Sequence, residues 1–181
     1  KKAYVCIDLK TSLATPLVEK VLEETNDQVI ATPEYALSQA DENTLLIIVD
    51  TRRKDFTECP QLLDSCGKVV VIDHHRRSTD FISDVSLVYH EPYASSTCEM
   101  ATEILQYIDT NKKMTAFESK ALYTGIVMDT KNFSVKTGVR TFEAASWLRR
   151  NGADLEKVRR YFQADGENVR IRAMCVANAH F

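Results

Sequence analysis

The 181-residue sequence predicts an α/β fold, with a mostly parallel sheet flanked by helices and a helical C-terminal part. Two continuous apolar runs, Leu45–Val49 and residues 69–72, are each followed by an aspartate. Runs of this kind suit strands that are buried on both faces of a parallel sheet. Segments whose apolar residues recur at helical spacing lie between and after these runs, which is the order expected of strand–helix–strand units.

The first half of the sequence alternates between strand-like and helix-like segments. Residues 3–9 form a short run rich in strand formers, and Leu87–His90 is a further predicted strand. Between them, Thr15–Glu24 places its apolar residues on one helical face, with a proline suited to the first turn. A shorter helix is expected to begin at Thr32 and to end near Asp41.

The second half is predicted to be helical. Ser96 with Glu99, and Thr115 with Glu118, are spaced as capping boxes at the starts of two helices, the second of which runs towards Asp129. Further helices are expected over residues 141–150, over residues 154–162 and from about residue 165. In the first of these, three apolar residues are expected in the core and two arginines on a solvated face, namely Phe142, Trp147, Leu148, Arg149 and Arg150.

The overall composition is that of an ordinary soluble protein, with 44% apolar and 27% charged residues. A formal net charge of -3 argues against a protein that tracks long duplex nucleic acid, which usually carries a basic face. The five cysteines include no C-x-x-C pair, which argues against a zinc knuckle or a disulfide framework and favours reduced thiols in the cytoplasm. No apolar run is long enough to cross a membrane.

Groups typical of hydrolytic metal sites gather where the predicted strands end. Asp50 follows the first apolar run, and Asp73 follows the second and precedes two imidazoles and two guanidinium groups, namely His74, His75, Arg76 and Arg77. In an open parallel sheet, ligands bind beyond the carboxyl ends of the strands. Carboxylates and imidazoles are ligands of Mn²⁺, Fe²⁺ or Zn²⁺, and arginine binds phosphate through paired hydrogen bonds. Each feature alone has an ordinary structural explanation, but the joint pattern indicates a metal site that acts on a phosphate ester.

Two further places could contribute to such a site. Asp129 lies at the C-terminal end of a predicted helix, where the helix dipole favours a bound cation over an unpaired carboxylate. Ser95 and Ser96 precede another predicted helix, whose N-terminus could bind phosphate through hydroxyl and N–H groups. Simple capping of that helix by Ser96 explains the same pattern equally well, and both functions can hold together.

Several segments carry a resemblance to a known family. The sequence VVVIDHHRR resembles the signature of the DHH phosphoesterase superfamily, and LLIIVDTRR and GIVMDTKNF resemble its second and fourth motifs. The last of these, together with HEPYASST, is most similar to the cyclic-di-AMP phosphodiesterases of the GdpP type. The resemblance implies a DHH domain of the α/β class and Mn²⁺-dependent hydrolysis at a two-metal site.

The resemblance also implies roles for individual residues. The metal ligands are matched by Asp50, His74 and Asp129. Asp73 would support the ligands, and His75 would lie near the scissile phosphate and assist the leaving oxygen, although a merely supporting histidine would give the same pattern. Arg76 would offset the charge that develops on the phosphate. Binding of the substrate phosphate is assigned to Ser95, Ser96 and Arg77.

By the same resemblance, the chain is expected to be part of a longer protein. Residues 1–163 would form a DHH phosphoesterase domain without its first strand and its first metal motif, a His-x-Asp-x-Asp sequence that supplies further ligands. Residues 164–181 would begin a linker helix to a DHHA1 domain, and membrane helices would anchor the parent protein. The fragment alone is therefore expected to bind metal weakly and to hydrolyse its substrate poorly.

The expected function is hydrolysis of cyclic-di-AMP to pApA. A nanoRNase or RecJ-like exonuclease that acts on short oligonucleotides is the alternative with the same chemistry. A non-catalytic nucleotide-binding module is the alternative of another class, because the first metal motif is absent from the sequence. The expected partner is thus a cyclic dinucleotide or a short oligonucleotide, and a homodimer is the assembly considered.

Overall fold

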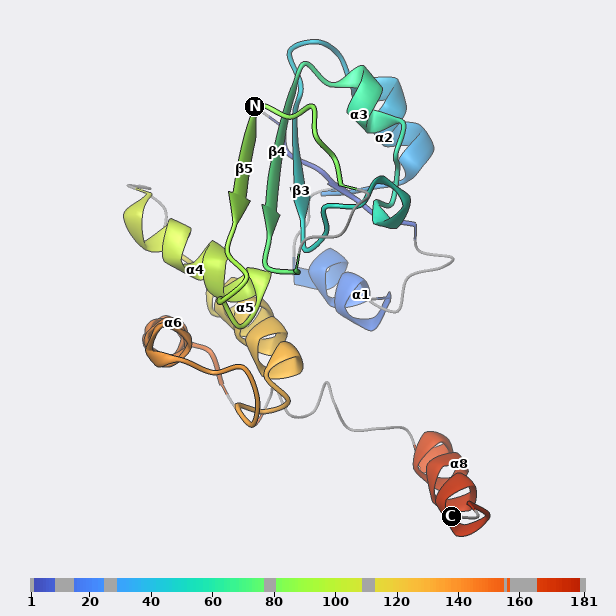
Figure 1. The fold of residues 1–181 in the computed structure, drawn as a ribbon, viewed down its shortest axis with the longest axis vertical. Helices are drawn as coiled ribbons and strands as arrows, with labels where there is room; N and C mark the ends of the chain where they lie inside the picture. The colour runs from blue at the N-terminus through green and yellow to red at the C-terminus, as the bar shows by residue number, and fades with distance from the viewer. Residues whose placement is uncertain are drawn as a thin grey trace.

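The computed structural model describes residues 2–8, 15–24, 29–76, 81–108, 113–154, 156 and 166–179. It confirms the predicted α/β class, because every described strand pair is parallel and helices flank the strands (Figure 1). A two-stranded sheet pairs β1 (Val5–Cys6) with β2 (Ile30–Ala31). A three-stranded sheet has the order β3-β4-β5, formed by Leu45–Val49, Lys68–Asp73 and Leu87–His90.

The predicted helices that the structure describes occur in the expected order, and two short helices between β3 and β4 were not predicted. Near the two sheets lie α1, α2, the short 3-10 helix η1 and α3, with bounds Thr15–Glu24, Pro33–Gln39, Lys54–Phe56 and Leu62–Ser65. The second half contributes α4, α5, α6 and α8, with bounds Thr97–Tyr107, Ala116–Asp129, Val139–Arg150 and Gly166–Ala177. Most of the helix predicted over residues 154–162 lies outside the described residues.

The predicted capping box is complete at the start of α5, whereas only its N-cap hydrogen bond forms at the start of α4. At α5, the Thr115 hydroxyl accepts from the Glu118 N–H, and the Glu118 carboxylate accepts from the Thr115 N–H at 2.7 Å. At α4, Ser96 caps the Glu99 N–H at 3.0 Å, but the Glu99 carboxylate accepts from Ser95 instead of closing the box. Sequence spacing predicts the cap, whereas the partner of the glutamate depends on the preceding turn.

The three-stranded sheet buries one face only, which corrects the prediction of strands buried on both faces. On the covered face, Ile48, Val69 and Val71 pack with Ile82 and with Leu63 of α3. Side chains that point the other way from β3 stay exposed, by 54%, 53% and 56% for Leu45, Ile47 and Val49. A continuous apolar run shows that both faces of a strand could be buried. It does not show that other parts of this chain pack against both faces.

A second core lies between the C-terminal helices α5 and α6. It contains buried residues of both helices and of the turn that follows, namely Tyr123, Ile126, Val127, Ala144, Ala145, Leu148 and Ala153. The core prediction is confirmed for Leu148, which is 0% exposed, and Trp147 packs partly buried against the same cluster. It is wrong for Phe142, which is 55% exposed and stacks on Phe133 outside the cluster of buried residues.

Helix α8 lies apart from the other elements (Figure 1). Its apolar residues Ile171, Met174 and Val176 are exposed, so it does not contribute to either core. Among the described residues, no helix combines the length and the apolar character needed to span a bilayer.

Candidate metal centre

The register of the parallel sheet brings the predicted site residues together. Val49 of β3 pairs with Ile72 of β4, so Asp50 follows β3 beside the carboxyl end of β4, where Asp73 is the last residue. The Asp50 N–H donates to the Ile72 carbonyl at 3.0 Å. Asp50 itself has a φ of 65°, a left-handed conformation that aspartate tolerates better than most residues. Such backbone strain is typical of functional sites, where the surrounding structure enforces it.

His74 lies between two carboxylates that come from different elements. Its Nε2 atom is 3.6 Å from Oδ1 of Asp50, after β3, and 3.7 Å from Oδ2 of Asp129, at the end of α5. Its Nδ1 atom lies 3.3 Å from the Ala94 carbonyl oxygen, which can only accept, so Nδ1 carries a hydrogen. In the neutral ring, Nε2 then has a lone pair directed at the same space as the carboxylates.

This geometry fits a bound divalent cation. Two ligand atoms that each lie roughly 2.1 Å from a metal ion are about 3–4 Å apart, which matches the separations around Nε2 of His74. Those separations are too long for good hydrogen bonds. Asp50, His74 and His75 also each offer a ligand atom within 4.8 Å of the others. The donor set of carboxylate oxygen and imidazole nitrogen suits Mn²⁺, Fe²⁺ or Zn²⁺.

Asp73 orients the second histidine. Its carboxylate is 1% exposed and accepts from both the Nδ1–H and the backbone N–H of His75, at 2.8 and 3.2 Å. The His75 ring is 58% exposed, in contrast to the buried His74 ring 4.5 Å away between centroids. His90 adds a further link, because its Nε2 donates to the His75 carbonyl at 2.6 Å. The His75 ring is thus fixed at one nitrogen and accessible to solvent.

Charge repulsion and burial affect the acid at the end of α5. Desolvation raises the pKa of the Asp129 carboxyl above its ordinary value, and the nearby charge of Asp50 raises it further. The positive groups near it, which include Lys136, oppose this shift without cancelling it. Burial and the same two carboxylates also raise the pKa of the Cys98 thiol to about 12, so the metal-free thiol stays protonated at neutral pH.

The predicted phosphate-binding residues are placed less favourably. Arg76 is exposed at the edge of the site, and Arg77 lies outside the described residues. Ser95 and Ser96 are buried, and their hydroxyls are engaged with the side chain and the backbone of Glu99. These contacts support capping of α4 and lend no support to phosphate binding by the two hydroxyls.

Two contributors to the site were missed in the sequence. The Thr97 hydroxyl donates to Oδ1 of Asp50 at 2.8 Å, and the Ala94 carbonyl fixes the His74 ring. Ala94 lies in the turn before α4 and Thr97 is the first residue of that helix, next to the two serines that the sequence analysis had considered for capping and phosphate binding. A hydroxyl and a backbone carbonyl carry no distinctive sequence signal, so only the fold shows what they touch.

A guanidinium pair close to Asp50 in sequence is the other missed feature. In the part of the chain that the structure describes, three buried side-chain nitrogens lack a hydrogen-bond partner, namely Nε and Nη1 of Arg52 and Nε of Arg53. The two guanidinium groups lie over the rings of Phe81 and Phe56, at 5.1 and 4.3 Å. Buried N–H groups without acceptors are costly, so they favour an anion that would accept from them.

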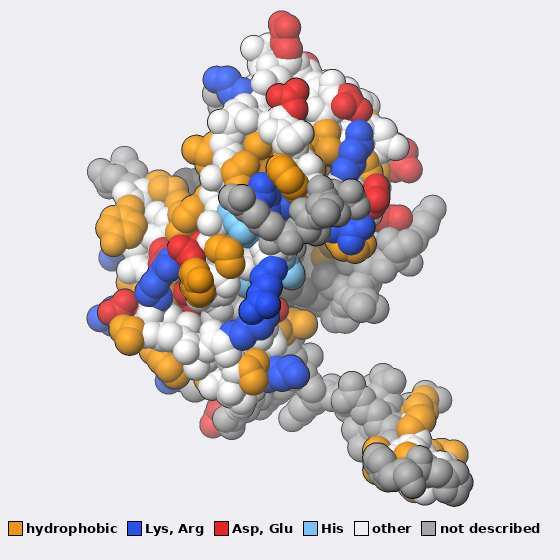
Figure 2. Space-filling view, viewed as in Figure 1, with side chains coloured by type: hydrophobic (Ala, Val, Ile, Leu, Met, Phe, Trp, Pro, Cys, Tyr) orange, Lys and Arg blue, Asp and Glu red, His pale blue; other side chains and the backbone are white. Residues whose placement is uncertain are grey.

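The site opens onto the molecular surface. Figure 2 shows histidine side chains exposed between the strand-containing part of the molecule and its helical part, with lysine and arginine side chains close by. Carboxylates and imidazoles at the carboxyl edge of a parallel sheet, with cationic side chains around them, define an α/β protein with a candidate site for a metal ion and an anionic ligand.

Comparison with known proteins identifies the family. The profile of the DHH family N-terminal domain matches residues 3–126, and the chain belongs to this family. The chain is 42% identical over 170 residues to the cyclic-di-AMP phosphodiesterase PdeA of Listeria monocytogenes, which covers 91% of this chain and 26% of that protein. It is 45% identical over 145 residues to the cyclic-di-AMP phosphodiesterase GdpP of Bacillus subtilis, covering 80% of this chain and 22% of that protein.

A solved structure supports the fold. An exopolyphosphatase-related protein from Bacteroides fragilis superposes with a TM-score of 0.71 at 19% identity, over 98% of this chain and 53% of that one. The present chain spans about a quarter of the length of the two phosphodiesterases. The comparisons thus confirm the predicted family and the predicted fold class.

Proposed function

We propose that this chain is the metal-binding part of a phosphodiesterase that hydrolyses cyclic-di-AMP to pApA. The observation that carries the proposal is the position of His74, whose Nε2 faces the carboxylates of Asp50 and Asp129 at 3.6 and 3.7 Å. The arrangement forms only when the ends of β3, β4 and α5 come together, whereas a cluster of surface acids can form within a single element. The names of the relatives supply the substrate: both are described as cyclic-di-AMP phosphodiesterases.

The chain's own residues suit the steps of such a hydrolysis. A bound Mn²⁺ would polarise the phosphate and make a water molecule more acidic. Asp50, His74 and Asp129 would hold it, with Asp50 positioned by Thr97. The water oxygen bonds to phosphorus while the bond from phosphorus to the 3′ oxygen breaks, and that oxygen needs a proton. His75 in its imidazolium form, with Nδ1–H held by Asp73, would deliver that proton from Nε2, and the proton lost by the attacking water would pass to solvent.

Cationic side chains would hold the phosphate. Arg76 is exposed beside His75, as the predicted role requires. Arg52 has buried N–H groups without acceptors, and a phosphate oxygen is the acceptor they would suit best. Both guanidinium groups would offset the negative charge that grows on the phosphate during the reaction.

We also propose the predicted division of the chain. Residues 1–163 would be the DHH domain portion, and residues 164–181 the start of a linker helix to a further domain. The separation of α8 from both cores supports this division. The exposed apolar face of β3 is consistent with a DHH portion that lacks some of its cover.

The test is release of pApA from cyclic-di-AMP with Mn²⁺, measured for this chain and for a longer protein that contains it. We expect release by the longer protein, little by the chain alone, and at least a hundredfold loss in His74→Ala. Lys113→Ala, at an exposed position, is the control and should keep full activity. Equal rates for His74→Ala and the unmodified protein would refute the proposal. Cleavage of short RNA without cleavage of cyclic-di-AMP would assign the exonuclease function instead.

A further inference from the structure

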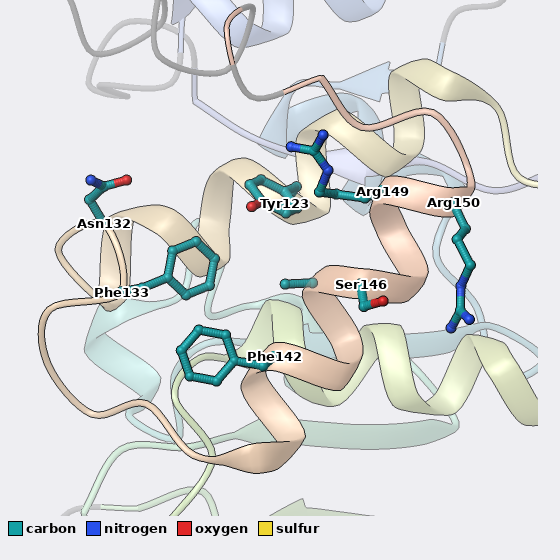
Figure 3. Close-up of a pocket in the computed structure, with 8 residues that line it drawn as sticks. Tyr123, Asn132, Phe133, Phe142, Ser146, Arg149 and Arg150 are labelled. Atoms are coloured by element: carbon teal, nitrogen blue, oxygen red, sulfur yellow. The ribbon is translucent and has the colours of Figure 1, made fainter.

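A pocket lies between α5, the turn after it and α6 (Figure 3). Its volume is about 670 Å³, within the range of roughly 300–1,000 Å³ that is typical of small-molecule sites. It is lined by Tyr123, Asn132, Phe133, Phe142, Ala145, Ser146, Arg149 and Arg150.

One side of this pocket is a small stack of aromatic rings. Phe133 and Phe142 stack at 5.5 Å with 20° between their planes, and Tyr123 meets Phe133 edge-on at 5.9 Å. Phe142 is 55% exposed, although its neighbours on α6 pack into the core. An aromatic ring left half in water keeps apolar area available, which a flat ligand could cover.

The other side offers polar side chains that no atom of the described residues engages. Figure 3 shows Phe133 and Phe142 together on one side of the pocket and Arg149 beyond Tyr123 on the other, with Ser146 between them on α6. Within the described part of the chain, no hydrogen bond or ion pair engages the side chains of Asn132, Ser146, Arg149 or Arg150. Arg149 and Arg150 extend in opposite directions, so Arg149 is the guanidinium group that can receive an anion beside Tyr123 (Figure 3).

The backbone conformation of the turn after α5 sets the orientation of Phe133 in the pocket. Lys131, Asn132 and Phe133 have φ values of 46°, 58° and 62°, and a left-handed conformation is strained for a bulky aromatic residue. Hydrogen bonds hold the turn, from Asn132 N–H to the Val127 carbonyl at 2.8 Å and from Phe133 N–H to the Thr130 hydroxyl at 3.0 Å. The turn starts directly after Asp129, so the pocket wall and the candidate metal ligand are parts of one continuous segment.

We propose that this pocket binds one nucleotide unit of the substrate or product, with its base against the Phe133–Phe142 stack and its phosphate on Arg149. The choice of a nucleotide rests on the proposed function, whereas the demand for a flat, anionic ligand comes from the pocket itself. Bases stack on aromatic side chains without strong preference for sequence, so this subsite would provide affinity more than base selectivity.

The probe is 5′-AMP, titrated into the chain in EDTA so that the candidate metal centre does not take part. Trp147 is the sole tryptophan and lies on α6 beside Ser146, so its fluorescence reports on the pocket. We expect saturable binding of AMP, weakened at least tenfold by Phe142→Ala and by Arg149→Ala. Tenfold corresponds to about 1.4 kcal/mol. Val139→Ala, at a 76% exposed position on the same helix, is the matched control and should bind normally.

Three outcomes would overturn the inference: no saturable AMP binding, unchanged binding in both variants, or equal affinity for AMP and inorganic phosphate. Circular dichroism of each variant checks that it is folded, and Phe142→Leu tests whether an aromatic ring is needed. The proposed function fails separately, because AMP binding in EDTA does not depend on hydrolysis. If the protein binds AMP in this way but releases no pApA, the proposed nucleotide pocket stands and the proposed phosphodiesterase function is refuted.

Discussion

Nε2 of His74 and Oδ2 of Asp129 lie 3.7 Å apart, although one follows a strand of the sheet and the other ends a helix of the C-terminal core. Neither atom has a proton to share when His74 is neutral and Asp129 is ionised, so the contact is unfavourable by itself. A cation between them turns it into an attraction. The candidate metal centre therefore connects the two cores of the molecule, and ion binding should affect the stability of both.

The first prediction concerns stabilisation by Mn²⁺. A ligand that binds only the folded state at one hundred times its Kd adds about 2.7 kcal/mol to the free energy of unfolding. We expect Mn²⁺ to raise the midpoint of thermal unfolding of this chain, and His74→Ala to remove most of that rise. Lys113→Ala should respond like the unmodified chain. An undiminished Mn²⁺ response in His74→Ala would show that the ion binds elsewhere.

The second prediction concerns pH in the absence of metal. The pKa of Asp129 is raised by burial and by Asp50, so the folded chain binds this proton more tightly than the unfolded chain does. The free energy of unfolding therefore falls as pH rises from the ordinary carboxyl pKa, about 4, through the raised value. Asp129→Asn should accordingly stabilise the chain at neutral pH in EDTA and have little effect below pH 4.

Thermal unfolding in EDTA at the two pH values measures this difference. In Mn²⁺ the order should reverse, because Asp129→Asn removes a ligand charge. If Asp129→Asn is less stable than the unmodified chain at neutral pH in EDTA, the carboxylate has a structural partner and the electrostatic argument is wrong.

The sequence predicted the site residues that directly follow apolar strands. It did not predict the environment of side chains whose neighbours are distant along the chain. Asp50, Asp73 and His74 could be placed because apolar runs end at them and parallel strands share a carboxyl edge. Phe142 could not, because helical spacing does not distinguish a ring in the core from one at its rim. Arg52 was overlooked for a similar reason: its unpaired N–H groups become apparent only after Phe81 is packed against it.

The third prediction concerns the contact between α4 and α5. A Cβ atom at Gly125 would collide with the Sγ atom of Cys98, so alanine at residue 125 would force Cys98 or the two helices to shift. Gly125→Ala should lower the free energy of unfolding by about 1–3 kcal/mol, as overpacking of a core does. It should also weaken Mn²⁺ binding, because Cys98 adjoins Thr97, which donates to Asp50.

Chemical denaturation of Gly125→Ala measures the loss, and Gly138→Ala is the matched control, since a Cβ there meets nothing within 4 Å. The double variant Gly125→Ala/Cys98→Ala should recover much of the stability, because it removes the colliding sulfur. Equal losses in the single and double variants would locate the strain somewhere other than this helix contact.

The last prediction separates a functional arginine from a structural one. Nε and Nη1 of Arg52 are buried without acceptors, and each such group costs about 1–3 kcal/mol. Arg52→Met keeps the stem over Phe81 and removes those N–H groups, so the ligand-free chain should be as stable as before or more stable. Inorganic phosphate should stabilise the unmodified chain against heat, and this effect should be lost in Arg52→Met and only weakened in Arg52→Lys. A large loss of ligand-free stability in Arg52→Met, with the phosphate response intact, would instead make Arg52 a structural residue that holds the segment around Phe81.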